Sequence, residues 1–186
     1  PSTWSVKPES DNVLLLKHWT LNGRPTRLAP YFDGAPPHEL GGMDQVSLGQ
    51  IPTNSDLKNP KQFVYQTRFR VQGHFPVSLV CEQESLRGQW SAALNERPLK
   101  AWRKKERYDP FNLEHDLRSF VRQGVNVLTF QFTIHKTIEG MIEPCRLFGS
   151  FHVATEAGRG NVPAGINGIN PKTGKSIDIY KTGPSV

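Results

Sequence analysis

Between Phe63 and Val153 the chain alternates apolar and polar residues in short segments separated by turn-like residues. In Phe63–Val71, the residues Phe63, Tyr65, Thr67, Phe69 and Val71 take one set of alternate positions, whereas the other set includes a glutamine and two arginines. A period of two predicts a β-strand with one face buried and the other in solvent.

Four later segments show the same character, and we expect each to contain a strand. They are Val77–Gln83, Gln89–Leu94, Val125–Ile134 and Glu143–Val153. The intervening sequence Asn95-Glu96-Arg97-Pro98 predicts a turn. Several short strands with little helix between them predict an all-β protein, a β-sandwich or jelly roll.

A sandwich buries one face of each of its two sheets. We expect Tyr65, Phe69 and Val71 on one inner face, and Phe130, Phe132 and Ile134 on the facing sheet. A single short helix is predicted at 112–123, where Leu113, Leu117, Phe120 and Val121 share a helical face and Gly124 follows as a stop.

The order of motifs resembles a known family. Y-x-T-x-F-x-V is followed by an apolar strand with Glu, W-x-x-x-L-N-x-x-P, D-L-x-x-x-V-x-x-G-x-N-x-L and I-E-P-x-x-L-x-G-x-F-x-V. The residues that carry these motifs are Tyr65, Thr67, Phe69, Glu82, Trp90, Asn95, Asp116, Leu117, Gly124, Asn126, Leu128, Ile142, Glu143, Pro144, Leu147, Gly149 and Phe151. This series is similar to the galactose-binding-like jelly-roll domains of large bacterial glycoside hydrolases.

With Asn12–Leu21 as a first strand, the resemblance covers about two thirds of the chain. It implies a non-catalytic carbohydrate-binding or structural accessory domain, secreted or periplasmic, with a neighbouring catalytic domain in the same parent chain. It implies no cofactor, although a structural calcium ion would be compatible with such a fold. None of the motifs is a catalytic signature.

A chain of 186 residues can build one sizeable core. We expect a single domain at 1–153 with a long irregular insertion at 22–60, packed on the sandwich through Tyr31, Phe32 and Met43. A Gly-rich extension or linker is expected at 154–186, with one late strand possible at 176–180. No apolar run is long enough for a membrane helix. Because the chain begins at Pro1, we expect either a processed chain or an excised piece of a longer protein.

The net charge of +6 would suit an acidic partner. Basic residues gather at 97–107, a run that contains Trp102 and is followed by Tyr108. Such a run is compatible with a solvated loop, or with phosphate contacts and base stacking in a nucleic-acid-binding β-domain.

The two cysteines, Cys81 and Cys145, suit either a disulfide or two reduced core thiols, and their spacing is not that of a zinc site.

Catalysis by this chain alone is not expected. Glycoside hydrolysis needs two carboxylates about 5–10 Å apart, and Glu82 and Glu143 each have an arginine nearby in sequence that suits a structural ion pair. The six histidines are scattered singly, and no nucleophile motif is present. The alternative to an accessory sugar-binding domain is a protein-interaction or scaffold sandwich without a sugar site.

A sugar site needs an aromatic ring to stack on a pyranose and polar groups to bind its hydroxyls. Trp102 is the best stacking candidate, because its neighbours are charged and its ring has no apolar run to join. Tyr108, Arg103 and Asn95 lie near it in sequence and complete the predicted ligand site. On this prediction the ring of Trp102 is exposed and contributes little to stability.

Overall fold

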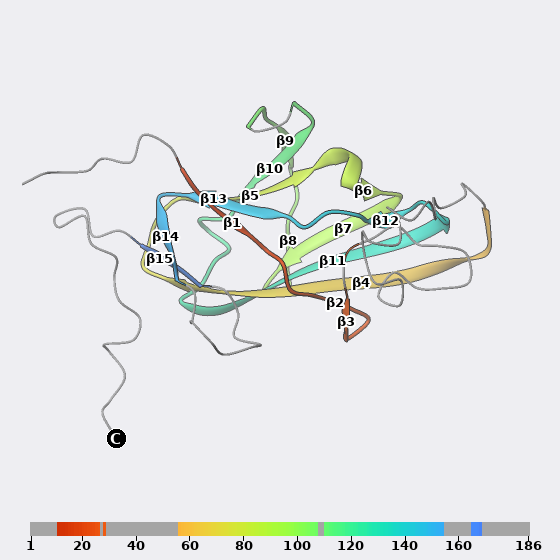
Figure 1. Ribbon diagram of the computed structural model, residues 1–186, viewed down its shortest axis with the longest axis horizontal. Helices are drawn as coiled ribbons and strands as arrows, with labels where there is room; N and C mark the ends of the chain where they lie inside the picture. Colours follow the sequence, from red (N-terminus) through yellow and green to blue (C-terminus); the bar gives the residue numbers. More distant parts are fainter. Residues whose placement is uncertain (1–10, 27, 29–55, 108–109, 155–164, 169–186) are drawn as a thin grey trace, which may run out of the picture.

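The computed structural model describes residues 11–26, 28, 56–107, 110–154 and 165–168. These residues form an all-β sandwich, as the sequence predicts. Figure 1 shows the long strands β4 and β11 side by side along the lower part of the view, with β1, β13 and β5 above them. No helix among the described residues is long and apolar enough to span a membrane.

Among the described residues, one sheet has five antiparallel strands in the order β1-β13-β5-β10-β9. Their bounds are Asn12–Leu15 (β1), Arg146–Gly149 (β13), Val77–Glu82 (β5), Asn112–Asp116 (β10) and Arg103–Lys104 (β9). We call it the five-stranded sheet. The candidate functional site described below lies on it.

The larger sheet has the order β14-β15-β4-β11-β7-β8, and β2 and β3 extend it from β4. The bounds are Phe151–Ala154 (β14), Gly165–Gly168 (β15), Asp56–Gln72 (β4), Gly124–Lys136 (β11), Gln89–Leu94 (β7), Arg97–Pro98 (β8), Trp19–Leu21 (β2) and Arg24–Thr26 (β3). A small ladder joins β6 (Leu86–Arg87) to β12 (Gly140–Met141), and a 3₁₀ turn spans Gln83–Ser85.

The six side chains predicted to form the core are buried, at 2% exposure or less. Their predicted distribution over facing sheets is wrong, because β4 and β11 are neighbouring strands in which Tyr65 lies opposite Phe130. All six therefore line one inner face of the larger sheet. The facing layer comes from the five-stranded sheet and includes Leu79 and Leu147, which are fully buried.

The helix predicted at 112–123 is wrong over its first half. Asn112–Asp116 is strand β10, which pairs with β5 on one side and with β9 on the other. Leu113, His115 and Leu117 follow a period of two toward the core, and ladder bonds to two neighbours satisfy the backbone better than an isolated helix would. Only one helical turn remains, where the amides of Phe120 and Val121 both donate to the Leu117 carbonyl.

The single strand predicted at Asn12–Leu21 is two strands in different sheets. After β1, Leu16 is bonded through its amide to the Cys145 carbonyl, and Trp19 Nε1 donates to the Leu16 carbonyl at 2.6 Å. These bonds turn the chain from the five-stranded sheet into the larger one, where β2 pairs with β4.

Strand β15 was not predicted. It lies in the Gly-rich extension and pairs in parallel with β4, and its Ile166 is fully buried. The late strand proposed at 176–180, and the insertion residues Tyr31, Phe32 and Met43, lie outside the described residues.

Cys81 and Cys145 are free cysteines in the core, and their sulfur atoms lie 2.6 Å apart. Burial raises the pKa of the Cys81 thiol well above its ordinary value, and the neighbouring Cys145 raises it further. The thiol of Cys81 is therefore protonated at neutral pH.

Candidate functional site

A cavity of about 770 Å³ lies on the outer face of the five-stranded sheet. Along β5 and β13, Leu79 and Leu147 point into the core, so the alternate residues Ser78 and Phe148 point outward, and both line the cavity. Glu114 and Asp116 of β10 line it beside them, and the segment 98–107 contributes another wall. The cavity is thus formed by a sheet surface and by the connection that carries β9.

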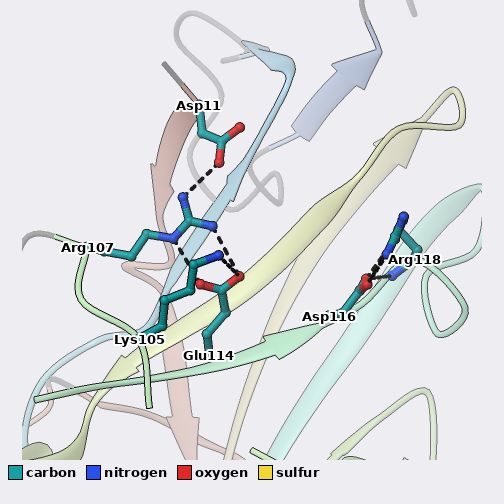
Figure 2. A network of polar contacts seen from close by, with 6 residues as sticks. All are labelled: Asp11, Lys105, Arg107, Glu114, Asp116 and Arg118. Atoms are coloured by element: carbon teal, nitrogen blue, oxygen red, sulfur yellow. Dashed lines mark hydrogen bonds and ion pairs between the residues drawn. The ribbon is translucent and has the colours of Figure 1, made fainter. Parts of the chain in front are cut away.

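Two carboxylates hold the Arg107 side chain, as Figure 2 shows. Its Nε donates to Glu114 Oε2 at 2.9 Å and its Nη2 donates to Glu114 Oε1 at 3.1 Å, a bidentate pair. Its Nη1 donates to Asp11 Oδ2 at 2.8 Å. The guanidinium also lies over the Phe148 ring, 5.0 Å from its centroid. Four contacts from three different parts of the chain therefore fix this side chain.

Glu114 is mostly buried, with 11% of its side chain exposed. Burial alone would raise its pKa, but hydrogen bonds from Arg107 and Ser78, with the charges of Arg107 and Lys105, outweigh burial and lower the pKa below its ordinary value. Lys105 Nζ lies 3.4 Å from Glu114 Oε1. The carboxylate is therefore ionised at neutral pH and paired on more than one side.

We expect Glu114→Gln to lower the free energy of unfolding by about 1–2 kcal/mol at neutral pH, because the charge-assisted bonds to Arg107 are lost. A carboxyl group whose pKa is depressed by folding contributes stability above its unfolded pKa, and this stability is lost as the pH falls through the folded value. The difference between wild type and variant should therefore shrink below about pH 4.

Urea denaturation at several pH values measures this difference. Glu84→Gln is the matched control, because Glu84 is exposed and makes no ion pair within the described part of the chain. It should stay within about 0.5 kcal/mol of wild type at every pH. A Glu114→Gln deficit that persisted unchanged in acid would contradict the assignment.

A second ion pair lies further along β10 in Figure 2, between Asp116 and Arg118. Arg118 Nε donates to both carboxylate oxygens at 2.9 and 3.1 Å, and the Arg118 amide donates to Oδ1. The hydrogen bonds from Arg118 lower the pKa of Asp116. Both partners are more than half exposed, so the pair orders the cavity rim and adds little stability.

Among the described residues, six Lys or Arg side chains and three Asp or Glu side chains line the cavity, a net charge of +3. Every one of the three carboxylates is engaged by an arginine. Within the described chain, no carboxylate lies at ion-pairing distance from Lys100, Arg103 or Lys104. The positive excess of the cavity therefore belongs to these three residues.

The prediction that the Trp102 ring is exposed and joins no apolar residues is wrong. Its ring contacts Trp90, His115 and Phe130 at centroid distances of 5.5, 5.4 and 6.3 Å, and its Nε1 donates to the Leu99 carbonyl at 3.1 Å. Half-buried, it covers the edge of the core beneath the basic segment and is not among the residues that line the cavity. A role for it in ligand binding stays a prediction.

Asn95 is one of the two residues of the turn between β7 and β8, and both it and Glu96 have positive φ, 51° and 67°. A two-residue hairpin loop of this kind favours asparagine. Its side chain accepts from the Val127 amide and donates to Asn126 Oδ1 and to the Phe120 carbonyl. These bonds occupy the amide group in fastening the turn to β11 and to the Phe120 backbone, and Asn95 is not among the described residues that line the cavity.

Of the four residues predicted to bind ligand, Arg103 lines the cavity, opposite Glu114 in the ladder between β9 and β10. Tyr108 lies outside the described residues. Sequence reasoning missed Asp11, Glu114 and Phe148, which come from three separate strands or strand ends. The bond from Arg107 to Asp11 joins residues 96 positions apart, and no local pattern indicates such a contact.

In the part of the chain that the structure describes, no group of three or more His, Cys, Asp or Glu side chains is placed to hold a metal ion. The cavity offers guanidinium and ammonium donors, carboxylate acceptors and two half-buried aromatic rings, Phe120 and Phe148. Such a surface can bind a polar ligand through hydrogen bonds and charge.

No protein-family model and no curated protein sequence matches this chain. The solved structures similar to it include three β-glucuronidases. That of Dictyoglomus thermophilum matches with 11% identity and a TM-score of 0.47, over 84% of this chain and 32% of the other. That of Ruminococcus gnavus matches with 10% identity and a TM-score of 0.48, over 83% of this chain and 32% of the other. That of an uncultured Clostridium species matches with 12% identity and a TM-score of 0.44, over 84% of this chain and 33% of the other. This chain therefore spans about a third of the length of these structures.

Proposed function

We propose that this chain is a non-catalytic carbohydrate-binding or structural accessory domain of a larger glycoside hydrolase, secreted or periplasmic in a bacterium. The observation that carries the proposal is the cavity on the outer face of the five-stranded sheet, with its fixed guanidinium and carboxylate groups. The motif order resembling sugar-binding jelly rolls supports it from the sequence.

The chemistry of the cavity suits a sugar. Its volume lies within the usual range for small-ligand sites, about 300–1,000 Å³. Sugar hydroxyls both donate and accept hydrogen bonds, and the cavity offers acceptors on Glu114 and Asp116 and donors on Arg107, which uses three of its N–H groups in the bonds described above. Because these groups are held in place, little side-chain entropy would be lost on binding.

The electrostatics of the cavity favour binding over catalysis. A general acid for glycoside hydrolysis needs a raised pKa so that it stays protonated near neutral pH. The Glu114 and Asp116 carboxyl groups have lowered pKa values and are each bonded to an arginine. Neither is placed to donate a proton, which supports a role for this chain beside a catalytic domain.

The test is a titration of the folded chain with a panel of oligosaccharides, followed by amide chemical-shift mapping of each hit. We expect shifts at residues that line the cavity, along β5, β10 and the segment 98–107. Chemical-shift changes confined to the larger sheet would place the sugar site there and contradict its assignment to the cavity. Absence of binding to every oligosaccharide would favour the scaffold alternative without a sugar site.

A further inference from the structure

The charge of the cavity indicates which sugars it can bind, an inference that rests on the proposed function. Around Arg107, the charges of Arg107 and Lys105 are balanced by those of Asp11 and Glu114, and Arg118 is balanced by Asp116. What remains is Lys100, Arg103 and Lys104, three cations within five residues of sequence on one wall.

The segment that carries these cations is anchored. Leu99 is buried and its amide donates to the Ala92 carbonyl at 2.8 Å, and Trp102 is packed against the core. Ala101 between them has φ of 59°, so the chain bends there, and β9 then pairs with β10. The backbone positions of the three cations are thereby fixed relative to the cavity floor.

Aromatic stacking is a poor route to recognition here. One face of the Phe148 ring is covered by the Arg107 guanidinium, and one face of the Phe120 ring is covered by that of Arg97, at 4.5 Å from its centroid. Each of these two rings therefore has one face fewer to offer a pyranose, whereas charged groups make up half of the described lining. A ligand with its own negative charge gains most from such a surface.

We propose that the cavity binds anionic glycans, saccharide chains bearing carboxylate or sulfate groups, through Lys100, Arg103 and Lys104. The carboxylates of Glu114 and Asp116 on the same surface accept bonds from the sugar hydroxyls. A saccharide chain carries more hydroxyl donors for these carboxylate acceptors than a nucleic-acid backbone does, so a glycan fits the cavity better than a nucleic acid.

The experiment compares wild type with a variant carrying Lys100→Gln, Arg103→Gln and Lys104→Gln. The matched control carries Arg24→Gln, Lys58→Gln and Lys136→Gln, which remove the same charges from exposed positions on the larger sheet. Calorimetry at low and moderate salt uses oligogalacturonate, a sulfated dextran oligosaccharide, a neutral galactan oligosaccharide, polyglutamate and single-stranded RNA.

We expect wild type and control to bind at least one of the two acidic oligosaccharides about tenfold or more tightly than the neutral one, with affinity falling as salt rises. The cavity variant should lose about tenfold or more of this affinity. Preference for oligogalacturonate identifies a carboxylate ligand, and preference for the sulfated dextran identifies a sulfate ligand.

Equal binding of neutral and acidic oligosaccharides would overturn this inference and leave the proposed function intact. Binding of none of the oligosaccharides would overturn this inference and the carbohydrate-binding role, and would leave a structural or scaffold role. Equally tight binding of RNA or polyglutamate, lost in the same variant, would show a general polyanion surface and overturn the glycan assignment. Thermal unfolding checks that each variant folds. If the triple variant does not fold, the test becomes the loss of acidic-oligosaccharide affinity in Lys100→Gln alone, together with the salt dependence of wild-type binding.

Discussion

Phe130→Ala is expected to lower the free energy of unfolding by about 3–5 kcal/mol. Phe130 lies in β11 and is fully buried, and its ring packs against Trp19, Trp90, Trp102 and Phe132 at centroid distances of 5.9–6.5 Å. Alanine would leave a cavity among large rings that cannot collapse easily, because β4 and β7 hold β11 on both sides.

Chemical denaturation measures this change, with an unchanged denaturant slope as the sign that the variant still unfolds in one step. The control is Phe111→Ala, at a phenylalanine that is 57% exposed, and we expect it to cost less than about 1 kcal/mol. Similar losses for the two variants would mean that the aromatic cluster is not the centre of the core.

Period-two patterns predicted the strands well where burial follows the pattern. Gln89–Leu94 is β7 with the predicted bounds, and Phe63–Val71 lies within β4 with its alternate side chains buried. In these segments the polarity of most residues matches the burial of their own side chains. A sequence window of that length therefore contains the information needed to place a strand.

Where the sequence failed, a distant partner decides the structure. The apolar residues of 112–121 are compatible with both a helix and a strand, and pairing with β5 and β9 selects the strand. Strand β15 has little apolar pattern of its own, because it has one large buried side chain between glycines and depends on β4 for its backbone bonds. Neither partnership can be read from a local window.

In the candidate site, too, local sequence indicates some residues and distant contacts determine others. Arg103 was predicted from the basic run in which it lies, and the structure places it on the cavity wall. The network that fixes Arg107 joins β10 to Asp11 just before β1, two segments about a hundred positions apart. A charge run shows that cations gather, but only the fold shows which of them are balanced by carboxylates.

Trp102→Ala is expected to lower the free energy of unfolding by about 2–4 kcal/mol, less than a fully buried tryptophan would cost because the residue is partly exposed. The sequence predicted almost no change, on the premise of an exposed ring. The ring instead closes the cluster of Trp90, His115 and Phe130, and its N–H bond to the Leu99 carbonyl ties the two ends of the bend at Ala101.

Trp102→Phe separates packing from the hydrogen bond, because it keeps an aromatic ring and removes the N–H donor. We expect it to recover more than half of the stability lost in Trp102→Ala. Both variants should also weaken binding of the acidic oligosaccharide, since Lys100, Arg103 and Lys104 flank the ring in sequence and depend on it for their placement. Unchanged thermal unfolding of Trp102→Ala, together with lost binding of neutral and acidic sugars alike, would instead make Trp102 a direct stacking residue.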